Sequence, residues 1–209
     1  MSSRVEEKVV SVMSEAIEYD HSRIDVSSDR TTCTLKAGGT SVALGDPVFV
    51  SGKHSWECVI EESFHSWGDG MLIGVTDATG TTGEAWGLFP LTGHVHICAT
   101  TDQCGKRGKQ VCEPLNGYAK GSRIRVTVDL ERRTLAFSIG GKPDVEAGIQ
   151  LPPQVRPWIL MSFQGDSISV GSGKPTVGVE RGAVSSESMR RPQCIIHRSD
   201  SGARYALPS

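Results

Sequence analysis

The 209-residue sequence has no apolar run approaching the roughly 20 residues that cross a membrane. Its beginning, MSSRVEEKVV, contains acidic residues and lacks the apolar core of a secretory signal, so we expect no export signal. The formal net charge of −2 gives no strong field of one sign. We therefore expect neither nucleic acid nor a membrane as a partner.

The sequence also lacks a CxxC pair. Without that motif or an export signal, we expect reduced thiols and a cytoplasmic location, with the nucleus as the alternative. The six cysteines are Cys33, Cys58, Cys98, Cys104, Cys112 and Cys194.

Motifs of nucleophilic and phosphate chemistry are missing as well. No GxSxG elbow occurs, and Gly52-Lys53 leads straight into a predicted strand instead of opening a helix. Cys104 lies near Lys106 and Arg107, and such cations lower the pKa of a thiol. An exposed loop thiol is the simpler interpretation, so we expect no enzyme.

Paired carboxylates are the remaining catalytic pattern to test. Glu57 and Glu61 share a strand face at about 13 Å, which exceeds the roughly 5–9.5 Å of glycosidase pairs. Glu61 and Glu62 are adjacent and point to opposite faces. Surface charge is the favoured interpretation, and a carbohydrate-binding or hydrolytic jelly roll stays as the alternative, since different strands can contribute acids.

One run has the spacing of metal ligands. His94, His96 and Cys98 share a strand face, and Cys104 or Cys112 would complete a tetrahedral zinc site. An exposed histidine pair is the simpler interpretation because no CxxC knuckle accompanies the run. We expect no metal and no cofactor.

The two ends of the chain differ from its middle. An amphipathic helix is predicted over residues 3–18, within an N-terminal segment 1–19, and it either packs on the domain or recruits a partner. Residues 174–209 carry six Lys or Arg against three acids and few large apolar residues. We expect this segment to be a basic, disordered tail, since it buries too little surface to offset chain entropy.

The middle, residues 20–173, has the two-residue period of β-strands. Apolar and polar residues alternate around Trp56, Val126, Phe137 and Ile168, as in antiparallel strands with one buried face. Glycine- and proline-rich turns separate the segments. Many short strands without interspersed helices predict an all-β fold with two antiparallel sheets in a sandwich.

Five motifs resemble those of the SPRY (B30.2) family in their order along the chain. Gly52-Lys53-His54-Ser55-Trp56-Glu57-Cys58 resembles the family's G-x-H-x-W-E-V strand, with Cys58 in place of valine. The other four are Ile73-Gly74-Val75, Ala85-Trp86-Gly87-Leu88, the hairpin Gly121 to Gly141, and Leu151-Pro152 to Trp158, and Ile24 to Val50 resembles the extra strands of a B30.2 unit.

The resemblance covers roughly residues 20–171 and implies a concanavalin-like β-sandwich that binds a peptide or protein through loops at one edge, without catalysis or metal. The motif aromatics Trp56, Trp86, Phe137 and Trp158 are predicted to pack in the core. They indicate the fold and not the partner. The family's peptide contacts vary too widely to be transferred to particular residues here.

Two segments are the candidate binding sites. The first, Ser63 to Gly70, places Phe64, His65, Trp67 and Asp69 outside any strand alternation, with Trp67 as a candidate anchor. The alternative is that Phe64 and Trp67 close the end of the sandwich. The second is a predicted loop, 101–109, where Lys106 and Arg107 would pair with an acidic peptide or only solvate the loop. We expect an adaptor for a protein or peptide partner, and the sequence leaves the oligomeric state open.

Overall fold

The structure is a computed structural model, and every residue that it describes lies in the first of two units, Met1–Pro175 and Thr176–Ser209. The described residues are 18–19, 23–45, 47–64, 70–78, 83–99, 105–115 and 120–171. They form fourteen strands and no α-helix, which confirms the all-β prediction. Most of the predicted helix 3–18 and the whole tail 174–209 lie outside these ranges, but Glu18 begins strand β1 and so is not helical.

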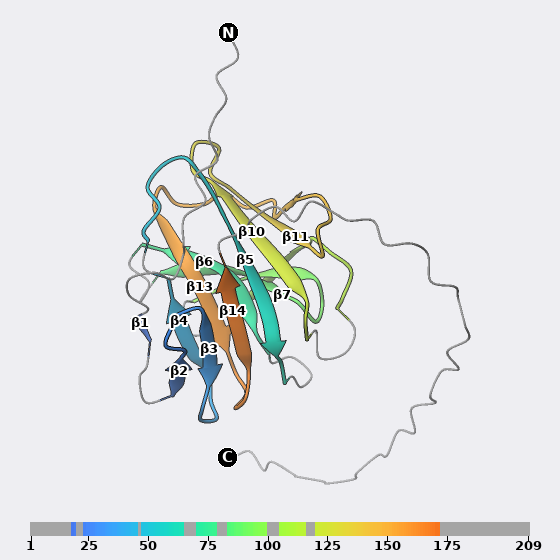
Figure 1. Cartoon of the computed structure of the whole chain (residues 1–209). Helices are drawn as coiled ribbons and strands as arrows, with labels where there is room; N and C mark the ends of the chain where they lie inside the picture. Colours follow the sequence, from blue (N-terminus) through green and yellow to red (C-terminus); the bar gives the residue numbers. More distant parts are fainter. Residues whose placement is uncertain are drawn as a thin grey trace, which may run out of the picture. The chain divides into compact units, whose positions relative to one another are not determined.

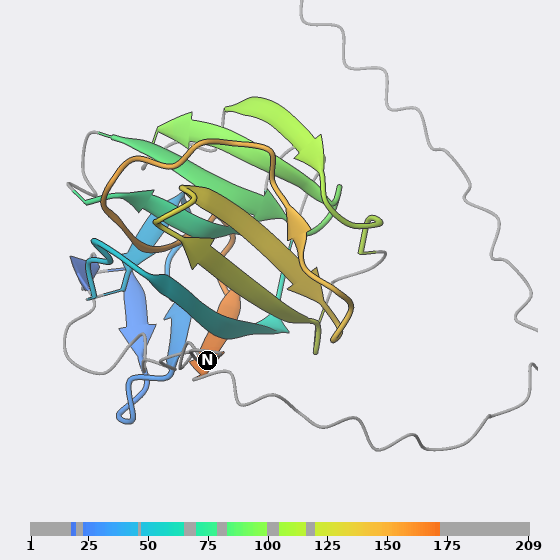
Figure 2. The same cartoon turned by 90° about the horizontal axis from the view of Figure 1, so that it is seen from above.

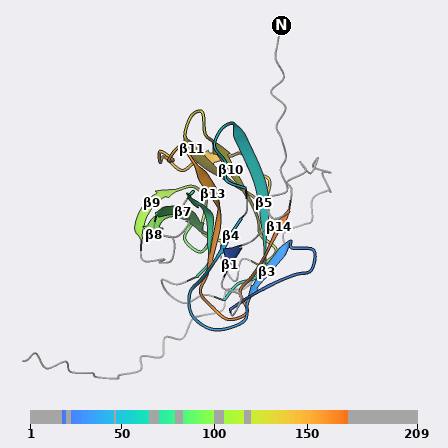
Figure 3. The same ribbon diagram turned by 90° about the vertical axis from the view of Figure 1, so that its left-hand side faces the viewer.

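Every strand pairing is antiparallel, and the strands form two sheets of seven (Figure 1). The first sheet has the order β1 (Glu18–Tyr19), β4 (Ser41–Leu44), β13 (Val155–Met161), β6 (Leu72–Asp77), β7 (Glu84–Phe89), β8 (His94–Ala99) and β9 (Lys106–Gln110). The second has the order β12 (Val145–Glu146), β11 (Thr134–Ile139), β10 (Arg123–Asp129), β5 (Lys53–Glu62), β14 (Ser167–Gly171), β3 (Thr32–Leu35) and β2 (Ile24–Val26). In Figure 1, β6 and β7 run behind β5 and β10, and Figure 3 shows the two layers from the side.

The main core lies between the two sheets. Alternate residues of the inner strands point into it, as the two-residue period predicts. Trp56 and Phe137 come from the second sheet, and Trp86 and Ile159 come from the first. The register places Phe137 opposite Val126 and Val126 opposite Trp56, so bulky side chains lie in a row across β11, β10 and β5. Burial of all four predicted core aromatics is confirmed.

A second apolar cluster lies on the outer face of the first sheet. Trp158 is 0% exposed there, although its neighbour Ile159 points the other way into the main core. A side-chain carbon built on Gly87 would lie 2.7 Å from the Trp158 ring, so the tryptophan needs a glycine beneath it. Strand β13 is consequently buried on both faces. Other members of the cluster are Leu44, Leu72, Ala85, Phe89, Cys98 and Leu160.

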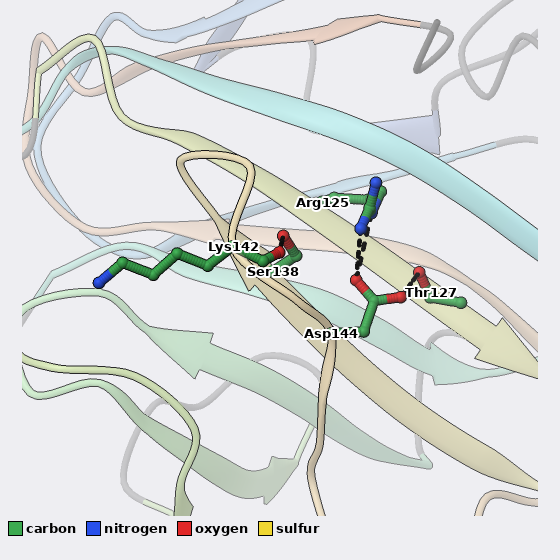
Figure 4. A network of polar contacts seen from close by, with 5 residues as sticks. All are labelled: Arg125, Thr127, Ser138, Lys142 and Asp144. Carbon is green, nitrogen blue, oxygen red and sulfur yellow. Dashed lines mark hydrogen bonds and ion pairs between the residues drawn. The ribbon is translucent and has the colours of Figure 1, made fainter. Parts of the chain in front are cut away.

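The outer face of the second sheet is polar instead. In Figure 4, Asp144 accepts hydrogen bonds from Arg125 and Thr127, while the Ser138 hydroxyl donates to the Lys142 carbonyl. These contacts fasten the connection that follows β11 onto β10 and β11. No helix in the described part of the chain is long and apolar enough to span a membrane.

Candidate functional site

Phe64 lies just beyond the end of β5. Among the described residues of the predicted Ser63 to Gly70 site, it is the one with an exposed large apolar side chain. Its side chain is 45% exposed. Its backbone N–H donates to Asp166 Oδ1 at 2.8 Å. The ring lies against Gly165, where an added side-chain carbon would come within 2.8 Å of it. Phe64 is therefore a partly exposed aromatic residue with a fixed backbone, which suits an interface anchor.

The side chain that fixes Phe64 is Asp166, which is 0% exposed. Its second oxygen, Oδ2, accepts hydrogen bonds from the backbone N–H groups of Ser162 at 3.1 Å and Phe163 at 3.0 Å. A buried carboxylate needs such donors, because hydrogen bonds to a charged group offset its loss of water. Asp166 thus joins the connection between β13 and β14 to the end of β5.

Residues 162–166, which we call the anchoring turn, fold in this way for a local reason. Asp166 N–H donates to the Phe163 carbonyl at 2.9 Å, and Gly165 has a φ of 95°. A positive φ at the third position of a four-residue turn is the requirement of type II, which favours glycine. Gly165 at the third position is the residue that marks this turn in the sequence.

The anchoring turn also holds the other end of the candidate segment. The Ser162 hydroxyl donates to the Gly70 carbonyl at 3.0 Å. The two ends of segment 65–69 are therefore fastened to one turn, through Phe64 at the start and Gly70 at the end. His65, Trp67 and Asp69 belong to that segment and lie outside the described residues.

Lys106 and Arg107 belong to a different surface. The prediction of a loop over 101–109 is wrong for residues 106–109, because Lys106–Gln110 is strand β9 (light green in Figure 2). The strand was not predicted because an edge strand with polar residues on both faces shows no alternation of apolar and polar residues. β7 and β8 separate it from β6, which follows segment 65–69. At about 4.8 Å per strand spacing, β6 and β9 lie about 14 Å apart, so the structure does not bring these cations to Phe64.

Arg107 lies beside the two histidines of β8. A terminal nitrogen of its guanidinium lies 3.0 Å from His94 Nδ1, which is also 2.8 Å from the Thr92 carbonyl oxygen. One protonation state of Nδ1 cannot serve both contacts, because guanidinium only donates and a carbonyl only accepts. Burial lowers the pKa of His96, and the charges of Arg107 and His94 lower it further.

The predicted metal ligands do not form a site in the part of the chain that is described. His94 and His96 lie on the outer face of β8, with His96 edge-on to Phe89 at 5.3 Å between ring centroids. Cys98 is buried in the outer apolar cluster. Within the described ranges, no three His, Cys, Asp or Glu side chains are grouped to hold a metal ion. Cys104 lies outside those ranges.

The carboxylates of β5 have partners on the polar face. Glu57 accepts a hydrogen bond from Arg123 at 2.5 Å, Glu61 accepts one from the Ser169 hydroxyl, and Glu62 pairs with Lys120. Each of these acids is held at the surface by a side chain of a neighbouring strand or loop. This arrangement agrees with the interpretation of these acids as surface charge.

Comparison with known proteins gives the fold and not the partner. No protein-family model and no curated protein matches the sequence. The crystal structure of the SPRY domain of human HERC1 has a TM-score of 0.54 at 18% identity and covers 74% of this chain and 98% of that chain. The crystal structure of the TRIM65 PSpry domain has a TM-score of 0.50 at 14% identity, and the match covers 75% of this chain and 92% of that chain.

The fold is that of SPRY domains. The carbohydrate-binding module CBM66 from Bacillus subtilis has a TM-score of 0.49 at 8% identity, covering 74% of this chain and 91% of that chain. A likeness this weak has no bearing on the carbohydrate alternative.

The strand that resembles the SPRY signature serves folding. Trp56 and Cys58 of the G-x-H-x-W-E-C motif are buried between the sheets. The His54 ring stacks on Phe49 with centroids 4.1 Å apart, and its Nε2 lies 2.7 Å from the Ser51 carbonyl oxygen, so this nitrogen is the donor. The motif therefore explains the SPRY-like sandwich and leaves the binding surface to other residues.

Proposed function

We propose that this chain is a non-catalytic protein-interaction module that binds a peptide or protein surface through the segment held by the anchoring turn. The observation that carries the proposal is the combination at Phe64 of an exposed aromatic ring and a backbone fastened by the buried Asp166 carboxylate. Anchors of this kind concentrate binding energy, and a fixed backbone lowers the entropy lost on binding.

The SPRY-like fold supports the same proposal, because the resemblance implies binding of a peptide or protein through loops. The acids of β5 lie at the surface with hydrogen-bonding partners on neighbouring elements, as the surface-charge interpretation expects. The proposal includes a cytoplasmic or nuclear adaptor role, which is supported by the free thiols of Cys33, Cys58, Cys98 and Cys112.

The experiment begins with affinity purification of the tagged chain from its native cell, followed by calorimetry with each purified partner. We expect Phe64→Ala to lower the affinity for a specific partner tenfold or more, which corresponds to a loss of about 1.4 kcal/mol in binding free energy. Trp67→Ala tests the predicted anchor in the adjoining segment in the same way.

The matched control is Val50→Ala. Val50 is 59% exposed and precedes the start of β5, about 30 Å from Phe64 at strand spacing. Equal losses for Phe64→Ala and Val50→Ala would refute the assignment of the site. Saturable binding on a glycan array, or turnover in a hydrolysis screen, would instead favour the carbohydrate alternative.

A further inference from the structure

Strand β9 concentrates positive charge at one edge of the first sheet. Three of its five residues are cationic, namely Lys106, Arg107 and Lys109. No ion pair joins any of the three to an acid within the described residues, whereas Lys36, Lys120, Arg123, Arg125 and Arg132 each have one there. A cationic strand edge of this kind attracts an anionic group.

The two histidines of β8 extend the cluster. His96 is the register partner of Arg107, so both lie on the outer face of the sheet beside His94. The Arg107 guanidinium has a histidine ring nitrogen as its neighbour at 3.0 Å instead of a carboxylate. A carboxylate or phosphate placed there would accept hydrogen bonds from the guanidinium and from the imidazole rings.

The backbone of β9 adds a second requirement for the ligand. β9 is the last strand of its sheet and pairs with β8 alone among the described strands. An edge strand presents backbone N–H and C=O groups that an extended chain can pair with. Lys109 donates across to the Glu146 carbonyl of β12 at 2.9 Å, so its stem spans the edges of the two sheets.

Cations on an edge strand also have a protective role, because they deter pairing with the edge of another copy of the chain. The cations deter pairing with neutral or basic strands of other chains. An acidic strand meets attraction at the same edge, so the charge selects the kind of partner as well as excluding others.

We propose that the β9 edge binds an extended acidic segment of a partner protein, which adds to the first sheet as a further strand and places an anionic side chain against Arg107, His94 and His96. The anion is a carboxylate or a phosphate, which share this chemistry. The proposal does not rest on the function proposed for the Phe64 segment, since β9 lies on a separate surface.

The test uses fluorescence anisotropy of synthetic peptides with the full-length chain. The probe is an eight-residue peptide of alternating valine and glutamate, compared with a version in which lysine replaces glutamate and a version with one phosphoserine. We expect the acidic peptide to bind at least tenfold more tightly than the lysine peptide, with an affinity that falls as salt rises. Tighter binding of the phosphoserine peptide would assign the site to phosphate, and equal or weaker binding would assign it to carboxylate.

Two further probes test the geometry. An acidic peptide with N-methyl groups on alternate residues loses the hydrogen bonds of an added strand, and we expect its binding to fall tenfold or more. Hydrogen exchange should slow at the amides of β9 when the unmodified acidic peptide binds. Equal binding of the N-methylated and unmodified peptides would overturn strand addition.

The variants separate this surface from others. We expect Arg107→Glu, and to a lesser degree Arg107→Gln, to weaken the acidic peptide tenfold or more, with melting curves confirming that both variants fold. Lys120→Glu is the matched control because Lys120 is an exposed cation that already pairs with Glu62. Phe64→Ala should leave the peptide affinity unchanged, which keeps this test independent of the first proposal. Unchanged binding by Arg107→Glu, or equal binding of the acidic and lysine peptides, would refute the site.

Discussion

Asp166 joins three backbone N–H groups from two segments that are distant in sequence. It accepts from Phe64 on one side and from Ser162 and Phe163 on the other, and it is fully buried. An asparagine has the same shape, but its N–H₂ group would face backbone N–H donors, either that of Phe64 or those of Ser162 and Phe163. It would also remove the negative charge. Hydrogen bonds to a charged group contribute about 1.5–3 kcal/mol.

We therefore expect Asp166→Asn to lower the free energy of unfolding by about 2–3 kcal/mol, measured by urea denaturation. Partner binding at Phe64 should fall in the same variant, because the anchor loses its fixed backbone. The control is Glu61→Gln, whose hydrogen bond with Ser169 is exposed, and a change below about 0.5 kcal/mol is expected. If the two variants were equally stable, Asp166 would not hold the turn.

At the scale of single elements, the pairing of β6 with β7 depends on Gly74. A side-chain carbon built there would lie 1.9 Å from the Trp86 carbonyl oxygen, which belongs to the backbone of the neighbouring strand and cannot move aside. Gly74 and Gly87 are register partners, so the two strands approach each other closely at this point. Gly74→Ala would push β7 away from β6.

We expect Gly74→Ala to lower the free energy of unfolding by about 3 kcal/mol or more, at the upper end of the cost of overpacking. Thermal and urea unfolding of the purified variant would measure the change. Gly38→Ala is the control, because Gly38 has open space around it and no positive φ. A Gly74→Ala variant as stable as Gly38→Ala would contradict the close approach of the two strands.

The elements that could be predicted from sequence are those with one buried face. In β5, β10 and β11, large apolar residues alternate with polar or small ones, because one side of each strand faces the core. β9 was missed because both of its faces are polar. β13 was expected from its resemblance to the closing strand, yet its burial on both faces was not, since that depends on the cluster around Trp158.

The same reasoning applies to the candidate site. Phe64 was identified because it falls outside any strand alternation, in a loop segment of the kind that carries binding residues. Asp166 was missed because its partners are backbone groups, one of them 102 residues away in sequence. The separation of Lys106 from Phe64 follows from the order of the strands, which no local pattern specifies.

For the whole molecule, the two sheets place their cysteines at different depths. Cys33 and Cys58 lie in the core between the sheets, and Cys98 lies in the outer apolar cluster. Burial raises the pKa of Cys33 to about 11 and raises that of Cys58 further. Cys112 is only half-buried, and burial raises the pKa of its thiol as well. Because thiolate is the reactive form, the first three thiols report on opening of the domain.

We expect Cys33, Cys58 and Cys98 to react with iodoacetamide at pH 8 at least about a thousand times more slowly in the native protein than in urea, and Cys112 to react first. The measurement uses a Cys104→Ser, Cys194→Ser background, with each labelled cysteine identified by peptide mass spectrometry. If the sandwich opens as one unit, Cys33 and Cys58 are protected from labelling to the same degree, because both lie in the core between the two sheets. Much faster labelling of Cys98 alone would mean that the outer apolar cluster opens separately from the core. Fast labelling of Cys33 would contradict the burial of β3 in the core between the two sheets.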